Sequence, residues 1–189
     1  MGDVRPHPEA VAKTSDAARR GRSATESLAL RLPGAYRKAL RATFALPVGS
    51  RARRAALRST LKGSLAAFNR RDYELNTLAH HPDFRLGFGR AIDRPAGARE
   101  EYVGIAGLLE FLDLWLEALG EYRFEFVDVR DVTRERIAMQ VRQTSGGPSA
   151  PTVDELVAVV MDFSDGLLLR QVFWRDPAAA LRSLGVERI

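Results

Sequence analysis

The chain has 189 residues, of which 46% are hydrophobic, and a formal net charge of +5. It contains no Cys, which excludes disulfides, zinc–thiolate sites and thiol nucleophiles. No apolar run approaches the roughly 18–20 residues that a membrane-spanning helix needs. These values indicate one domain with its own core, together with an extension.

The positive charge is concentrated in the first third of the chain. Residues 1–65 carry fourteen Lys or Arg and four Asp or Glu, whereas residues 66–189 carry fifteen and twenty. Such an asymmetry is typical of an arm that binds nucleic acid, a membrane or an acidic partner, and equally of a basic face that lies on an acidic domain. Because no aromatic residues alternate with the N-terminal Arg residues, nucleic acid is an unlikely partner.

Residues 1–22 are predicted to form a disordered tail. They include Pro6 and Pro8 and too few large apolar side chains to form a core. The first ten residues have no apolar segment of the kind found in secretory signals, so we expect a cytoplasmic protein.

Residues 23–50 are predicted to form a basic helical extension. Ser23 and Glu26 have the spacing of a capping box, and Pro33-Gly34 then interrupts the helix. An apolar stripe follows at helical spacing, made of Tyr36, Leu40 and Phe44. This short helix either covers an apolar patch of its own domain or contacts a membrane or an acidic partner.

Helices dominate the next part of the chain, up to residue 120. A helix is predicted from the cap at Ser50 to about Arg70, and a second one from Tyr73 to His80. Residues 84–88 alternate as in a half-buried strand, and a polar loop over 89–102 precedes a helix over 105–119.

The rest of the chain is rich in strands. Alternating apolar residues predict strands over 122–128, 137–143, 153–163 and 167–174, with a hairpin turn at Asp165-Gly166. Pro177 stands at the favoured first position of a last short helix. This order predicts an α+β fold in which a curved, mostly antiparallel sheet is wrapped round helices.

Five segments in this order carry a resemblance to a known family. They are Phe68–Asp72, His81-Pro82-Asp83, the Gly104 and Gly107 pair, Asp165-Gly166 and Trp174-Arg175-Asp176. Together they resemble the SnoaL-like family of the nuclear transport factor 2-like (cystatin-like) superfamily. The resemblance implies a cone-shaped domain over residues 51–189, with a central pocket and a convex sheet face that often forms a homodimer. It does not select an activity, because the superfamily contains cyclases, isomerases and non-enzymes.

The acid–base residues of the family's enzymes have no clear counterparts in this chain. The positions that the resemblance assigns to them fall near Phe88, Val141, Gln143 and the inward residues of the last strand, predicted as Leu169, Gln171 and Phe173. The remaining catalytic candidates are Asp162, if it faces inward from its apolar strand, and His81, at the pocket mouth. In the non-catalytic interpretation, Asp162 belongs to the adjacent turn and His81 stabilises a helix end.

No metal or cofactor site is expected. His80 and His81 are adjacent on the predicted helix, so their side chains point about 100° apart and do not easily bind one ion. Trp174-Arg175-Asp176 is interpreted as a helix start, with Asp176 as the N-cap.

We therefore expect a pocket that binds a small apolar or polycyclic molecule. Its predicted lining residues are Phe88, Trp115, Met139, Val141, Gln143, Gln171 and Phe173. One alternative is a polyketide cyclase-like or steroid isomerase-like enzyme that uses Asp162 or His81 as an acid or base. The other alternative is a non-catalytic interaction module with a basic N-terminal arm.

Overall fold

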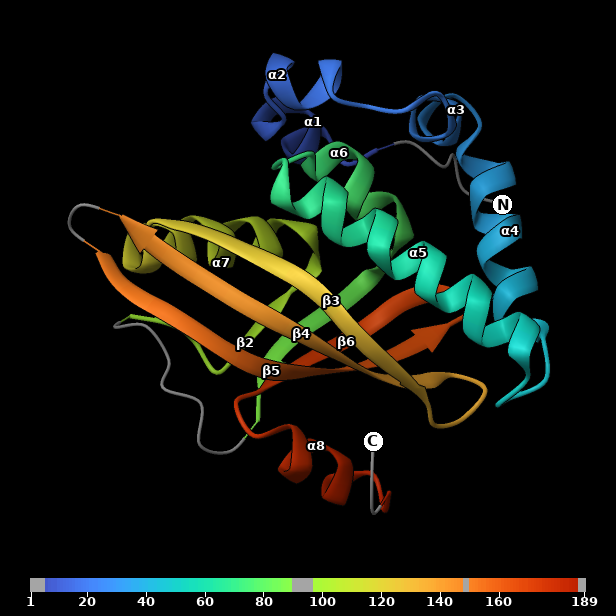
Figure 1. Cartoon of the computed structure of the whole chain (residues 1–189). Coiled ribbons are helices and arrows are strands. Elements are labelled where there is room, and N and C mark those ends of the chain that lie inside the picture. The colour runs from blue at the N-terminus through green and yellow to red at the C-terminus, as the bar shows by residue number, and fades with distance from the viewer. Residues whose placement is uncertain (1–5, 90–96, 148–149, 187–189) are drawn as a thin grey trace.

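A single curved sheet forms the body of the computed structural model, which describes residues 6–89, 97–147 and 150–186. Its strands are β1 (His80–Phe88), β2 (Glu101–Val103), β3 (Glu121–Asp131), β4 (Arg136–Gly147), β5 (Ala150–Ser164) and β6 (Leu167–Trp174). They lie in the order β2-β1-β6-β5-β4-β3 (Figure 1). Every neighbouring pair is antiparallel except β1 and β6, so the expected mostly antiparallel α+β fold is confirmed.

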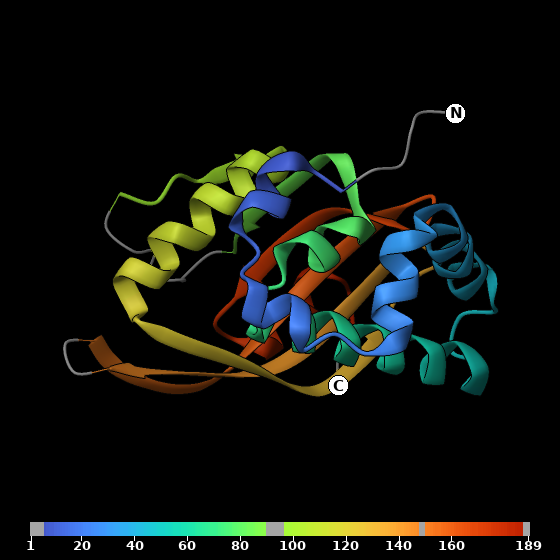
Figure 2. The same cartoon turned by 90° about the horizontal axis from the view of Figure 1, so that it is seen from above.

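The helices are distributed unequally over the two faces of this sheet. They are α1 (Pro8–Lys13), α2 (Asp16–Arg20), α3 (Ala24–Arg31), α4 (Pro33–Ala45), α5 (Arg51–Asn69), α6 (Tyr73–Asn76), α7 (Gly104–Leu119) and α8 (Pro177–Ser183). All except α8 lie on the concave side, as the view from above also shows (Figure 2). The apolar faces of α5 and α7 and the inward residues of the strands form the main core between them.

Helix α8 covers part of the opposite, convex face. Asp176 accepts a hydrogen bond from the Ala178 amide at 2.8 Å and so caps the helix, as the sequence predicted. Ala180 is fully buried against Ala158 and Val160. A homodimer through the convex face stays a prediction.

The N-terminal segment is ordered where a disordered tail was expected. Residues 8–20 form α1 and α2, and Ala10 is fully buried in the main core. The sequence pattern missed this because small alanines, rather than large apolar groups, make the contact. Arg22 then fixes the segment: it donates to both oxygens of the buried Asp72 at 2.7 Å and to Glu74 at 2.7 Å.

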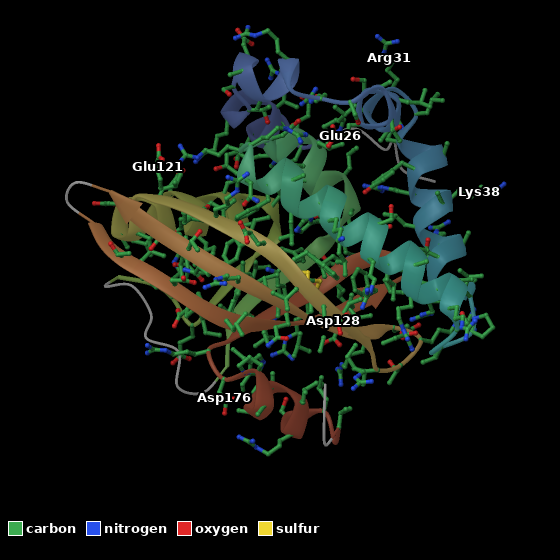
Figure 3. The ribbon with its side chains drawn as sticks, in the orientation of Figure 1. Glu26, Arg31, Lys38, Glu121, Asp128 and Asp176 are labelled. Atoms are coloured by element: carbon green, nitrogen blue, oxygen red, sulfur yellow. The ribbon has the colours of Figure 1, made fainter. Side chains whose placement is uncertain are left out.

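Several basic residues of the N-terminal third pair with acidic residues of the domain. Besides Arg22, these are Lys13 with Asp113, Arg19 with Glu74, Arg41 with Asp165, Arg53 with Asp131, and Arg58 with Asp128. This arrangement favours the interpretation of a basic face lying on an acidic domain. Arg31 and Lys38 instead project outward from α3 and α4 (Figure 3). Contact of residues 23–50 with a membrane or an acidic partner stays a prediction.

Two local differences from the predicted elements shape the interior. The helix predicted to His80 ends at Asn76, a 3₁₀ turn covers Thr77–Ala79, and β1 already begins at His80. The short strand β2 lies in the predicted loop over 89–102, of which residues 90–96 are outside the described residues.

The last hairpin contains a bulge that changes which side chains face inward. Asp162 pairs with Arg170, but Phe163 pairs with Leu168, so Leu169 is an extra residue in β6. Leu168 and Gln171 therefore both face the interior, and the predicted inward position of Leu169 is wrong. Alternation alone cannot reveal such an insertion.

Candidate functional site

A cavity of about 110 Å³ lies between the sheet and the helices α4, α5 and α7. Aliphatic and aromatic side chains make up most of its wall, which suits a small-molecule site. Its lining residues include Tyr36, Thr43, Phe44, Ser64, Asn76, His80, Leu86, Phe111, Trp115, Phe124, Met139, Val141, Phe163, Leu168, Gln171 and Phe173.

The N-terminal extension supplies one wall of this cavity. Tyr36, Leu40, Thr43 and Phe44 of α4 line it, and Leu40 and Phe44 are buried. The Phe44 and Phe163 rings lie 4.2 Å apart. The apolar stripe of this helix therefore packs on its own domain, which was one of its two predicted roles.

The turn between β5 and β6 must lie close to α4 for this wall to form. Gly166 has a φ of 78°, a conformation that side chains disfavour. A Cβ at this position would lie 2.8 Å from the Arg41 backbone nitrogen. Glycine thus provides both the predicted hairpin turn and the close contact with α4.

Aromatic rings surround one part of the cavity. Trp115 of α7 lies 5.1 Å from Phe111 and 6.3 Å from Phe173, and the Trp115 and Phe173 rings are nearly parallel. Phe124 of β3 lies 6.3 Å from Phe173 on another side. The indole N–H of Trp115 is buried and has no hydrogen-bond partner in the part of the chain that the structure describes. A buried donor without a partner is unfavourable, so this group marks a place where an acceptor would be stabilised.

A short chain of hydrogen bonds enters the cavity from α5. The Asn76 side-chain amide donates to Ser64 Oγ at 3.2 Å and to the Ser64 carbonyl at 3.3 Å. The Asn76 carbonyl in turn lies 3.2 Å from His80 Nδ1. Burial lowers the pKa of His80 from 6.5 to about 4, and the contact with the Asn76 carbonyl opposes this effect. His80 is therefore neutral at physiological pH.

This buried neutral imidazole is expected to make the fold less stable in acid. In the unfolded chain His80 binds a proton near pH 6.5, but in the fold only near pH 4. Its contribution to stability is complete above about pH 6.5 and is lost as the pH falls towards 4. Between pH 7 and pH 4, the free energy of unfolding of the wild type should fall by about 3 kcal/mol more than that of His80→Phe. Urea unfolding at both pH values measures this difference. His81→Phe is the control and should behave as the wild type, and equal falls in all three proteins would contradict the argument.

The structure brings five of the seven predicted pocket residues to the cavity. These are Trp115, Met139, Val141, Gln171 and Phe173. Phe88 lies behind the wall, with its ring 5.5 Å from Phe111 and 6.5 Å from Phe173. Gln143 is buried, but it lies two residues beyond Val141 along β4, where it pairs with Phe124 and Glu155.

Neither catalytic candidate reaches the cavity. Asp162 lies on the convex side of β5 with Val160, forms an ion pair with Arg136, and has Arg170 opposite it on β6. The inward position that would make it a catalytic candidate is therefore not observed. His81 accepts a hydrogen bond from the Asp83 amide at 3.1 Å and lies outside the cavity wall.

His80 is the functional candidate that the sequence analysis missed. Assigning residues 73–80 to a helix hid the fact that His80 and His81 point to opposite sides of a strand. His80 has the same parity as Phe84 and Leu86, which are inward residues of β1. Simple alternation does not lead from Phe84 back to His80, because Pro82 is exposed and the pairing with β6 is irregular between His80 and Arg85.

Charged groups are missing from the described part of the cavity wall, which contains no Asp, Glu, Lys or Arg. Over residues 6–89, 97–147 and 150–186, no three His, Asp or Glu side chains lie close enough together to hold a metal ion. Among the helices of the same ranges, none is both long and apolar enough to cross a membrane.

Comparison with known proteins identifies the fold. No protein-family model and no curated protein matches the sequence. Solved structures do match. One is TerC, crystallised with polyporic acid: it is 21% identical with a TM-score of 0.55, over 68% of this chain and 97% of TerC. Another is a nuclear transport factor 2-like protein of unknown function from Burkholderia pseudomallei, 21% identical with a TM-score of 0.56, over 66% and 94%.

A third match is Bal32a from a soil-derived mobile gene cassette, 16% identical with a TM-score of 0.54, over 69% of this chain and 95% of Bal32a. About a third of the present chain lies outside each alignment. The sheet order and these structures agree: the chain shares its cone-shaped α+β fold with these three structures, one of them a nuclear transport factor 2-like protein, and this is the fold that the resemblance implied.

Proposed function

We propose that the protein binds a small, neutral and mainly apolar molecule in the cavity between its sheet and helices. The observation that carries this proposal is the cavity itself, about 110 Å³ in volume and lined by apolar and aromatic side chains. Apolar and aromatic side chains of this kind gain favourable contacts when an apolar molecule enters.

The volume limits the size of the ligand. An engineered apolar cavity of about 150 Å³ binds benzene. A cavity of about 110 Å³ is of the same order, so it suits one ring rather than the polycyclic molecule that the resemblance allowed. A larger ligand would require α4 to move away from the β5–β6 turn.

The wall supports a neutral ligand. A charged group would lose its hydration in this cavity without gaining an opposite charge, because no charged side chain lines its described part. The aromatic rings of Phe111, Trp115, Phe124 and Phe173 favour a flat ring, because an aromatic ligand adds aromatic pairs to those that the wall already contains.

Binding of fluorobenzene, followed by ¹⁹F NMR, tests the proposal. The wild type should bind it saturably. Val141→Phe fills part of the cavity from the buried face of β4 and should weaken binding about tenfold or more, which corresponds to about 1.4 kcal/mol. Val127→Phe adds the same group at an exposed position of β3 and should bind as the wild type. Thermal unfolding confirms that each variant is folded, and equal binding by all three proteins would reject the cavity as the site.

The enzyme alternative now lacks a built acid–base set. Both candidates, Asp162 and His81, lie outside the cavity. The solved structures support the fold and do not transfer an activity. Native mass spectrometry of the purified protein would test the predicted homodimer and any small molecule that it retains.

A further inference from the structure

The hydrogen bonding of His80 fixes which of its nitrogens carries the proton. A backbone carbonyl only accepts hydrogen bonds, so Nδ1, which lies 3.2 Å from the Asn76 carbonyl, must be the N–H donor. The Asn76 side chain is itself held by Ser64 of α5. The Phe84 ring, 4.5 Å away and nearly perpendicular, restricts rotation of the imidazole. In the neutral ring the remaining nitrogen, Nε2, is therefore an acceptor with a fixed direction.

No hydrogen bond within the described part of the fold uses this acceptor. Nε2 has no hydrogen-bond partner among the described residues, although His80 is only 7% exposed and lines the cavity. The Gln171 amide also lines the cavity and is also without a partner in the described part of the chain. β1 and β6 are parallel neighbours, with His80 opposite Leu168 and Leu86 opposite Gln171, so both polar groups enter from the same side of the cavity.

A neutral acceptor in a site without charged side chains selects a particular chemistry. It stabilises a ligand that donates a hydrogen bond, because an unmade hydrogen bond in an apolar site is costly. An ammonium donor would lose its hydration without a carboxylate to replace it, and a carboxylate ligand would face a second acceptor. A neutral hydroxyl group satisfies Nε2 by donating a hydrogen bond to it.

We propose that the cavity takes a single-ring molecule with a hydroxyl group, of the phenol class, whose hydroxyl donates to His80 Nε2. This inference rests on the proposed function and adds the group that the ligand must carry. His80 is then a specificity-determining residue, and it separates a hydroxylated ring from an apolar ring of the same size.

A pair of ligands that differ in one group tests this inference. 4-Fluorophenol and 4-fluorotoluene have nearly the same size, and the hydroxyl of the first replaces the methyl of the second. Their dissociation constants are measured by ¹⁹F NMR for the wild type, His80→Phe and His81→Phe. The ratio of the two constants, phenol over toluene, should rise about threefold to tenfold in His80→Phe, the range expected for one lost hydrogen bond. The ratio cancels any general loosening of the cavity. His81→Phe makes the same replacement one residue away, outside the cavity, and should leave the ratio unchanged.

A measurement on the wild type does not depend on folding of the variant. In long-range ¹H–¹⁵N spectra, the Nε2 resonance of His80 should shift on addition of 4-fluorophenol and stay in place with 4-fluorotoluene. Failure of the two proposals is distinguishable. If neither ligand nor fluorobenzene binds, the cavity is not a binding site and the proposed function falls. If the apolar ligands bind but the ratio and the Nε2 resonance do not change, the cavity binds rings without recognising the hydroxyl, and only the present inference is overturned.

Discussion

Replacing Arg53 with Met is expected to lower the free energy of unfolding by about 3–5 kcal/mol, the usual result of removing one partner from a buried ion pair. Arg53 is fully buried and donates to Asp131 Oδ1 at 3.0 Å. It also donates to four backbone carbonyls, those of Phe44, Leu46, Thr133 and Arg134. Methionine would fill much of the volume, but it would leave the Asp131 carboxylate without its cation, with only the Gly49 amide as a donor, and the four carbonyls without the Arg53 donors.

Urea unfolding followed by circular dichroism measures this effect. Arg54→Met is the matched control, because Arg54 is the next residue of α5, is exposed, and should change the stability by less than about 0.5 kcal/mol. Similar stabilities for the two variants would show that the Arg53 contacts do not hold α4 and the β3–β4 turn together. Ligand binding is expected to weaken as well, since Arg53 holds the end of α4 and Phe44 of this helix lines the cavity.

Replacing Phe173 with Ala is expected to have a comparable effect on stability and a distinct effect on binding. The Phe173 ring is buried and lies within 6.5 Å of the rings of Phe88, Phe111, Trp115 and Phe124. Removing such a ring usually costs about 3–5 kcal/mol, from lost contacts and from the space left behind. That space adjoins the cavity, so the variant should bind a two-ring molecule such as naphthalene more tightly than the wild type does.

Thermal and urea unfolding give the first value, and titration with naphthalene gives the second. Arg170→Ala, on the opposite and exposed side of β6, is the control and should leave both unchanged. Equal effects of the two variants would mean that the inward face of β6 has been assigned wrongly. A destabilised Phe173→Ala that binds naphthalene no better would show that the cavity collapses rather than grows.

The strands and the long helices could be predicted because their apolar periods are local properties of the sequence. Helix α5 ends at Asn69 and α7 at Leu119, within a residue of the prediction, and Asp165-Gly166 forms the expected turn with both residues at positive φ. The cavity wall on β4 could be predicted for the same reason: Met139 and Val141 alternate with outward polar residues.

The features that failed prediction depend on contacts distant in the sequence. Helix α2 is followed by Arg22, which pairs with Asp72 fifty residues further along the chain, and no local pattern signals such a pair. Leu168 faces inward because β6 contains one extra residue. This residue is recognised only from the strand pairing, in which Asp162 lies opposite Arg170 and Phe163 opposite Leu168. His80 was missed because the helical segment ends early in a 3₁₀ turn, and β1 begins directly after this turn, at His80.

The cavity wall joins two segments that lie far apart in the sequence, α4 and the β5–β6 hairpin. Arg41 pairs with Asp165, 124 residues further along the chain, and the Phe44 ring lies against Phe163. Contacts so far apart in sequence form slowly, because a long loop must close before they gain any energy. A ribosome releases α4 well before β5 and β6 exist, so during synthesis the apolar stripe of α4 has no partner to pack on. The cavity is thus complete only when the last hairpin has been made, because Phe163, Leu168 and Phe173 of that hairpin belong to its wall.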